Sequence, residues 1–113
     1  CFIRPQRYTK EFVDNSDVIT LNFFDETHRN ALKICGTKSG RDCDKIALAG
    51  LTEFYDGQAV CFEESRMILV CRKLYVGRLE DTGFIDKSII GANYKENDFH
   101  YVYISEVEKV FVK

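Results

Sequence analysis

The stretch QAVCFEESRMILVCRKLYVGRL, residues 58–79, decides how the fold of this chain is interpreted. Two segments within it, residues 58–63 and residues 67–76, are rich in residues that favour β-strands, and a polar break at residues 64–66 separates them. The run Met67-Ile68-Leu69-Val70 is too apolar for an exposed edge strand. We therefore predict that the two segments form an antiparallel hairpin at the centre of the core.

Strand patterns continue on both sides of this hairpin. Residues 17–24 alternate between two sets of side chains with a period of two and are rich in β-forming residues, which indicates a strand. Residues 31–35 are typical of a short second strand with Leu32 and Ile34 on one face. Residues 99–112 return to β character, and we expect a break in that strand near Ser105.

One segment between the strands is ambiguous. Residues 44–55 fit a strand by the alternation of Ile46, Leu48 and Gly50, but they also fit a helix that Asp44 would cap. We prefer a strand or an irregular segment, and the helix stays an alternative. The dipeptide Asp56-Gly57 that follows is a strong turn signal.

The length and composition indicate one all-β domain. The chain has 113 residues, of which 45% are hydrophobic and 30% charged, and this suits a single globular core spanning residues 1–113 with an N-terminal arm at residues 1–16. About six strands and no long amphipathic helix favour an antiparallel barrel or sandwich, including a jelly-roll arrangement, with at most one short helix.

The net charge and the lack of a long apolar run argue against two classes of partner. A net charge of -2 lacks the basic face that nucleic-acid phosphates require, so we expect no nucleic-acid partner. No apolar run approaches the roughly 20 residues that span a bilayer, so we expect no membrane partner.

The cysteines favour an oxidising compartment. The chain contains five cysteines, about twice the common frequency, and its only methionine is Met67, so a processed and secreted protein is expected. Cys35 and Cys43 bracket a seven-residue loop and are candidates for a disulfide bond. Cys61 and Cys71 would lie opposite each other in the predicted hairpin, either as a second bridge or as two small buried hydrophobic residues.

No catalytic, cofactor or metal site is evident. His28 and His100 are the only histidines and lack the spacing of a zinc centre or of the cupin metal motif. The neighbouring acidic residues at 63–64 and at 106 and 108 suggest solvated strand edges more than a glycosidase pair, since the chain has no tryptophan. The loop at residues 36–40, GTKSG, faintly suggests a phosphate cradle but lacks the Walker spacing.

What remains is a binding surface. Arg72, Lys73, Tyr75 and Arg78 form a small basic and aromatic group that is a candidate for surface contacts with a protein partner. A short, processed, β-rich chain with several cysteines and no catalytic motif resembles the small secreted effectors of plant-pathogenic fungi, including rust avirulence proteins.

This resemblance implies a secreted, non-enzymatic binding protein, delivered in some cases into host cells, that contacts a host target or an immune receptor and needs no cofactor. It carries no residue-level function. The alternative is a small carbohydrate-binding or hydrolytic β-domain, which a pocket with converging carboxylates would distinguish.

Overall fold

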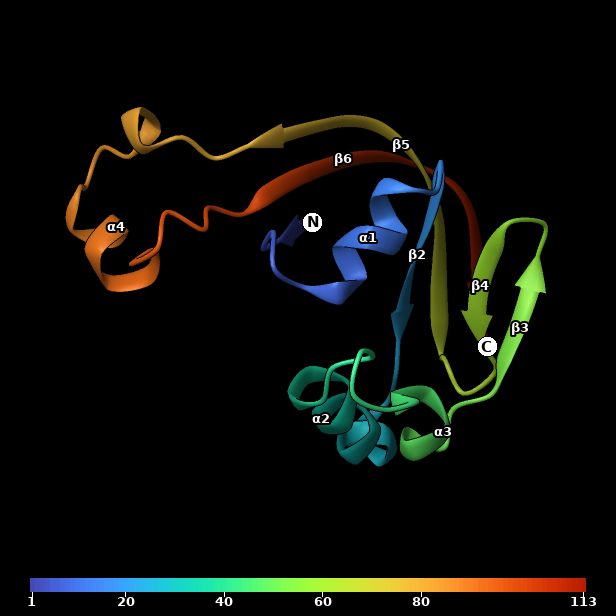
Figure 1. Cartoon of the computed structure of the whole chain (residues 1–113). Helices are drawn as coiled ribbons and strands as arrows, with labels where there is room; N and C mark the ends of the chain where they lie inside the picture. The colour runs from blue at the N-terminus through green and yellow to red at the C-terminus, as the bar shows by residue number, and fades with distance from the viewer.

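The computed structural model describes all 113 residues and consists of two antiparallel sheets with several short helices between the strands (Figure 1). The larger sheet has four strands in the order β1 (Phe2–Ile3), β6 (Tyr101–Val112), β5 (Met67–Arg78) and β2 (Val18–Phe23). The smaller sheet is the hairpin of β3 (Glu53–Asp56) and β4 (Ala59–Phe62). The α-helices are α1 (Tyr8–Asp14), α2 (Arg29–Thr37), α3 (Lys45–Ala49) and α4 (Ser88–Asn93), with 3-10 turns at Glu26–His28 and Asp81–Gly83.

The mainly β character is confirmed, but the expectation of at most one short helix is wrong. Residues 31–35, predicted as a strand, lie in α2, in which Ala31 is buried. Ala31, Ile34 and Cys35 have the spacing of one helical face, and in so short a segment the pair Leu32 and Ile34 imitates strand alternation. None of the helices is long and apolar enough to cross a membrane.

The ambiguous segment at residues 44–55 contains both structures. The side chain of Asp44 accepts a hydrogen bond from the backbone N–H of Ala47 and so caps α3, and Gly50 ends this helix at a φ of 72°. Strand β3 then begins at Glu53. The turn predicted at Asp56-Gly57 is confirmed, since it joins β3 to β4 with Gly57 at a φ of 59°.

The predicted hairpin of residues 58–63 with residues 67–76 is wrong in its pairing. Strand β4 pairs with β3, whereas β5 pairs with β2 and β6. The break at residues 64–66 turns the chain from one sheet into the other, because the N–H of Arg66 bonds the carbonyl of Phe23 and the Ser65 hydroxyl bonds Asn22. Cys61 and Cys71 are therefore not opposite each other, and both are buried.

The core lies between the two sheets, as the apolar run at residues 67–70 predicted. Ile68 and Val70 of β5 contact Ala59 and Cys61 of β4, and all four are buried. Polar groups join the layers at their margin, where Asn22 of β2 accepts a hydrogen bond from the backbone N–H of Phe62 in β4.

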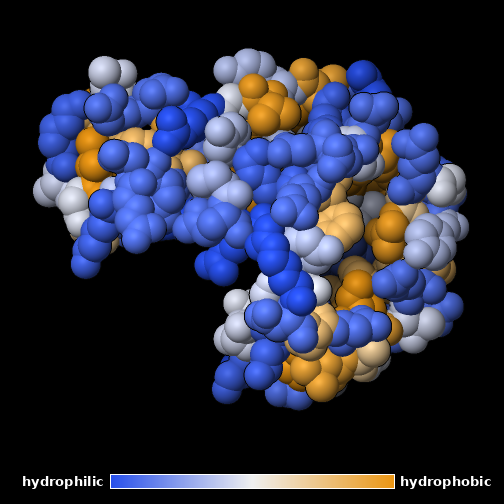
Figure 2. All heavy atoms as spheres, in the orientation of Figure 1, coloured by the Kyte–Doolittle hydropathy of each residue, from blue (hydrophilic) through white to orange (hydrophobic).

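Strands β5 and β6 form a long curved ribbon that carries α4 away from the rest of the molecule (Figure 1). The break predicted near Ser105 is wrong, because β6 runs without interruption from Tyr101 to Val112. The pairing shifts register there instead, since Leu74 of β5 is an extra residue between the pairs Lys73–Ser105 and Tyr75–Ile104. The curvature leaves a hollow between α4 and the α2–α3 region (Figure 2). Helix α1 lies on this concave side (Figure 1).

Val70→Asp should unfold or severely destabilise the chain. Val70 is 8% exposed in the apolar layer between the sheets, and an unpaired carboxylate there should cost at least about 3 kcal/mol. Thermal and urea unfolding would measure the loss. Ile104→Asp is the control because Ile104 is 53% exposed, and a melting curve of Val70→Asp equal to the parent would contradict this account of the core.

Candidate functional site: a cationic pocket

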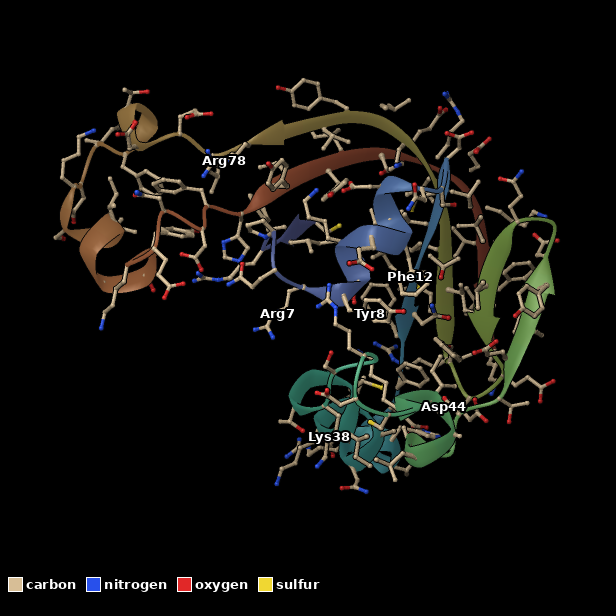
Figure 3. All side chains as sticks on the ribbon, in the orientation of Figure 1. Arg7, Tyr8, Phe12, Lys38, Asp44 and Arg78 are labelled. Carbon is tan, nitrogen blue, oxygen red and sulfur yellow. The ribbon has the colours of Figure 1, made fainter.

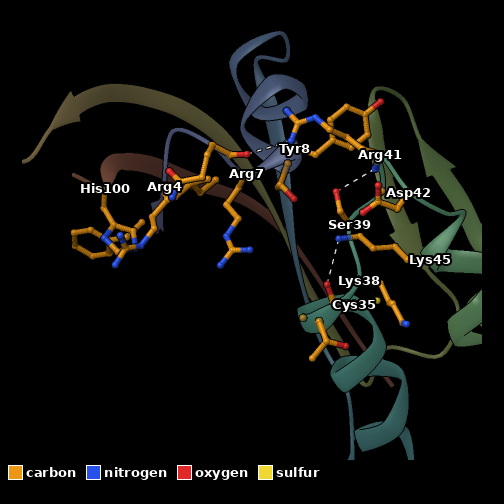
Figure 4. Close-up of a pocket in the computed structure, with 17 residues that line it drawn as sticks. Arg4, Arg7, Tyr8, Cys35, Lys38, Ser39, Arg41, Asp42, Lys45 and His100 are labelled. Carbon is orange, nitrogen blue, oxygen red and sulfur yellow. Dashed lines mark hydrogen bonds between the residues drawn. The ribbon is translucent and has the colours of Figure 1, made fainter. Parts of the chain in front are cut away.

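A pocket of about 630 Å³ lies in the hollow on the concave side of the molecule (Figure 4). One wall is the N-terminal segment from Phe2 to Thr9. The other wall is the end of α2 with the loop that follows it, residues 35–42, together with Lys45. His100, just before β6, completes the rim. The two walls are therefore distant in sequence and meet only in the folded chain.

Pairing with β6 fixes the first wall. Phe2 and Ile3 pair with Val102 and Tyr101, and the N-terminal ammonium of Cys1 donates a hydrogen bond to the Tyr103 carbonyl at 2.9 Å. The start of the predicted N-terminal arm is thus a short edge strand of the larger sheet.

Polar side chains at the edge of helix α1 hold it to the ribbon of β5 and β6. The Tyr103 hydroxyl donates a hydrogen bond to Asp14 at 2.6 Å, and Lys10 forms an ion pair with the same carboxylate. The Lys73 ammonium donates to the carbonyl of Val13 at the end of the helix. Burial raises the pKa of Asp14, but the bonds from Lys10 and Tyr103 outweigh burial, so its pKa lies below the ordinary value.

The second wall is a compact turn after α2. The carbonyl of Ser39 accepts hydrogen bonds from the N–H groups of Asp42 and Cys43, and the Ser39 hydroxyl accepts one from the N–H of Arg41 at 3.2 Å. The ring of Tyr8 occupies the space where a side chain on Gly40 would lie, since a Cβ there would be 2.9 Å from Tyr8 Cδ2. The loop therefore rests directly on α1.

Arg41 joins the two walls. Its guanidinium donates to the Gln6 carbonyl at 3.1 Å and to the Glu11 carboxylate at 2.8 Å, and it lies over the ring of Tyr8 at 4.7 Å (Figure 4). Both terminal nitrogens of the guanidinium and one of its flat faces are therefore engaged. Arg41 consequently acts as a structural tie across the pocket.

The lining is strongly cationic although the whole chain carries a net charge of -2. Five lysine and arginine residues line the pocket against a single carboxylate, that of Asp42. Arg4 is neutralised by Asp98 at 2.6 Å, and Lys45 donates to the Cys35 carbonyl. The side chains of Arg7 and Lys38 have no hydrogen bond or ion pair within the protein and border the pocket from opposite walls (Figure 3). The pocket is suited to an anion.

An aromatic group lies at the His100 end of the pocket. Nδ1 of His100 is 2.6 Å from the Tyr94 hydroxyl, and the ring of Phe2 meets His100 edge-on at 6.5 Å. Burial, followed by the nearby Arg4, holds the pKa of His100 below its ordinary value, so the imidazole is neutral at pH 7. The neutral His100 ring can therefore contact a flat polar group of a ligand whose anionic group binds Arg7 and Lys38.

The basic group predicted as a contact surface lies outside this pocket. Arg72 pairs with Glu106, Lys73 is bonded to α1, and Arg78 donates to the Asn97 carbonyl at 2.6 Å. Tyr75 is exposed on the ribbon. Each cation already has an intramolecular partner, and a role for these four residues in binding a protein stays a prediction.

The candidate disulfide residues lie at the second wall. Cys35 lines the pocket, and Cys43 Sγ is 3.7 Å from the carbonyl of Ser39. Both are free thiols in the structure, as are the other cysteines, and a bridge between them stays a prediction for an oxidised form. The residues that sequence reasoning missed are Arg7 and Lys38. The GTKSG loop was noticed but set aside on Walker spacing, although its cation and glycines were the available signal.

No protein-family model matches the chain, and no curated protein is similar to it in sequence. Solved structures do match it: an FMN-binding protein from Thermus thermophilus (TM-score 0.72, 18% identity), a flavoredoxin from Methanosarcina acetivorans (0.73, 21%), and a putative flavin reductase with a split barrel domain from Shewanella frigidimarina (0.73, 19%). Each match covers 99% of this chain but only 53%, 50% and 50% of the other chain, respectively. The chain therefore has the fold of about half of these proteins and spans about half their length.

These matches correct the functional interpretation of the sequence. The resemblance to fungal effectors and avirulence proteins is wrong, because the fold is that of flavoredoxins and flavin reductases. The expectations of a non-enzymatic effector and of a carbohydrate-binding or hydrolytic domain are overturned on the same ground. Composition and cysteine count, on which the effector interpretation rested, do not distinguish these classes.

Gly40→Ala should destabilise the chain by about 1–2 kcal/mol, because the added methyl group collides with a Tyr8 ring already confined by Arg41 and Phe12. Gly36→Ala is the matched control. It lies in α2 with nothing within 4 Å of its Cβ, so alanine there should stabilise the chain by up to about 1 kcal/mol. Urea unfolding of both variants would measure the two effects, and equal changes would contradict the contact between the walls.

The stability that Asp14 contributes should disappear in acid. Because its pKa is lowered in the folded state, the contribution is present above the unfolded value near 3.8 and is lost as pH falls through the folded value. Asp14→Asn should lower the urea midpoint at neutral pH and reduce the dependence of that midpoint on pH in the acid range. Asp17→Asn, an exposed aspartate nearby, should leave the pH dependence unchanged.

Proposed function

We propose that this chain binds flavin mononucleotide in the cationic pocket and forms part of a flavin-dependent oxidoreductase. The observation that carries the proposal is the pair of unpartnered cations, Arg7 and Lys38, that border a pocket of about 630 Å³ in a fold shared with FMN-binding proteins.

The residues present fit the phosphate of this cofactor. Arg7 and Lys38 can each donate charge-assisted hydrogen bonds, and Arg is suited to bidentate phosphate contacts. The backbone N–H groups of Ser39 and Gly40 have no acceptor within the protein and belong to the loop that lines the pocket. Cations and free amides together form the donor set that a phosphate monoester requires.

The opposite end of the pocket fits a flat heterocycle. Phe2 is 63% exposed, and His100 offers a neutral ring beside it. The bond to Tyr94 fixes the orientation of the imidazole, so that His100 can hold a hydrogen bond to a ring nitrogen or carbonyl oxygen without adding charge. Bound FMN would supply the electron-transfer chemistry, which protein side chains cannot provide by themselves.

FMN titration tests this proposal directly. Flavin fluorescence and absorbance should change saturably on addition of the protein, and Arg7→Ala and Lys38→Ala should each raise the Kd for FMN by about tenfold or more, as expected for loss of a hydrogen bond to a charged group. Arg29→Ala is the control, since Arg29 is a solvent-exposed arginine outside the pocket.

Riboflavin separates the phosphate from the ring. The parent protein should bind riboflavin more weakly than FMN, and Arg7→Ala and Lys38→Ala should change riboflavin binding little. An FMN affinity that is unaltered in both variants would show that these cations do not hold the phosphate. Unchanged flavin spectra at saturating protein would refute the cofactor assignment.

A further inference from the structure

Two cysteines bracket one wall of the cationic pocket. Cys35 lies in the last turn of α2, and Cys43 directly precedes Asp44, the residue that caps α3. The seven residues between the two cysteines, 36–42, all line the pocket, and Cys35 lines it as well. A bond between the two sulfur atoms would therefore close a ring that contains the whole loop of the second wall.

Both ends of this loop are already tied together. The Lys45 ammonium, two residues after Cys43, donates a hydrogen bond to the Cys35 carbonyl at 3.2 Å (Figure 4). The backbone N–H of Cys43 bonds the Ser39 carbonyl at 3.3 Å, and Sγ of Cys43 lies 3.7 Å from the same oxygen. Helices α2 and α3 also pack against each other. A disulfide requires the two Cα atoms to lie within about 7 Å of each other, and a loop tied at both ends favours that approach.

The remaining cysteines are poorly placed to compete for such a bond. Cys61 and Cys71 are only 0% and 3% exposed, and burial raises the pKa of both thiols. Because the thiolate is the attacking form, these two side chains react slowly. Cys1 is exposed, but its backbone is bonded to β6. Cys35 and Cys43 are half-buried, so a small reagent can reach them.

We propose that Cys35 and Cys43 form a reversible disulfide that controls how tightly the cationic pocket holds its anion. The oxidant is a small-molecule disulfide such as oxidised glutathione. One cysteine thiolate attacks a sulfur atom of this molecule and releases one small thiol, and the second cysteine then attacks the mixed disulfide and releases the other. One S–S bond breaks and one forms. The two protein thiols lose two electrons and two protons, and the oxidant becomes two thiols.

The bridge acts on the anion site because several of the donors of that site lie inside the ring. Lys38 and the free backbone N–H groups of Ser39 and Gly40 are all between the two cysteines. Ordering a loop on binding costs free energy, and a covalent ring removes part of that cost beforehand. The oxidised protein should therefore bind FMN more tightly than the reduced protein. This consequence rests on the proposed flavin function, whereas formation of the bridge does not.

Equilibration of the protein in buffers of graded glutathione ratio tests the bridge itself. Trypsin cleaves at Lys38 and Arg41, so mass spectrometry of the alkylated digest should show separate peptides joined through Cys35 and Cys43 with the loss of two hydrogens. Excess reduced glutathione should open the bond again. Cys1→Ser is the control and should form the same bridge. A parent protein in which these two thiols stay free, or carry only glutathione, overturns the proposal.

FMN titration of the reduced and oxidised proteins tests the control of binding. The Kd should be about threefold or more lower in the oxidised protein. Cys35→Ser and Cys43→Ser should each remove this difference, and Cys1→Ser should keep it. Equal Kd values in the two states of the parent overturn the proposal.

Inorganic phosphate separates this proposal from the cofactor assignment. If neither state binds FMN, the cofactor assignment fails, and the same comparison is made with inorganic phosphate, followed by the NMR shifts of the amides of residues 38–40. Tighter phosphate binding by the oxidised protein would support control by the bridge. Equal binding in the two states, or none in either, would overturn it.

Discussion

Strand β5 pairs on both sides, with β2 along its first half and with β6 along its whole length, and the rest of the structure depends on this double pairing. Because β5 is central, its alternating side chains divide between the two faces of the larger sheet, and Ile68 and Val70 form the core against β4. Because β6 follows β5 beyond the end of β2, the two strands continue as a ribbon that carries α4. The edge strand β1 then adds to β6 and brings the N-terminal segment to the concave side.

The pocket is a product of that arrangement and of the way charges are shared within it. Arg4, Arg41 and Lys45 have acceptors within the protein, and Arg41 joins the two walls. Arg7 and Lys38 have none, so the electrostatic attraction for an anion is concentrated at two side chains on opposite walls. A chain with a net negative charge can therefore contain a strongly cationic site, because net charge averages over surfaces that a ligand never meets.

The sequence predicted where strands lie better than it predicted which strands pair with each other. The strand at residues 17–24 and the burial of residues 67–70 were predicted correctly. Strand conformation and burial both follow from the pattern of side chains a few residues apart. The hairpin pairing was wrong because Ser65 and Arg66 bond to β2, a contact that no local pattern reveals. The pocket was missed for a similar reason. Its cations lie about thirty residues apart in the chain, and each is unremarkable in its own segment.

The bond between Arg41 and the Gln6 carbonyl spans 35 residues of sequence, so the pocket forms only where the folded chain brings its two walls together. A molecule held between such walls has affinity for the native state and almost none for the unfolded chain. Its binding free energy is then added to the stability of the native state by mass action. Binding of such a molecule and resistance to heat, urea and proteolysis would thus form a single linked equilibrium.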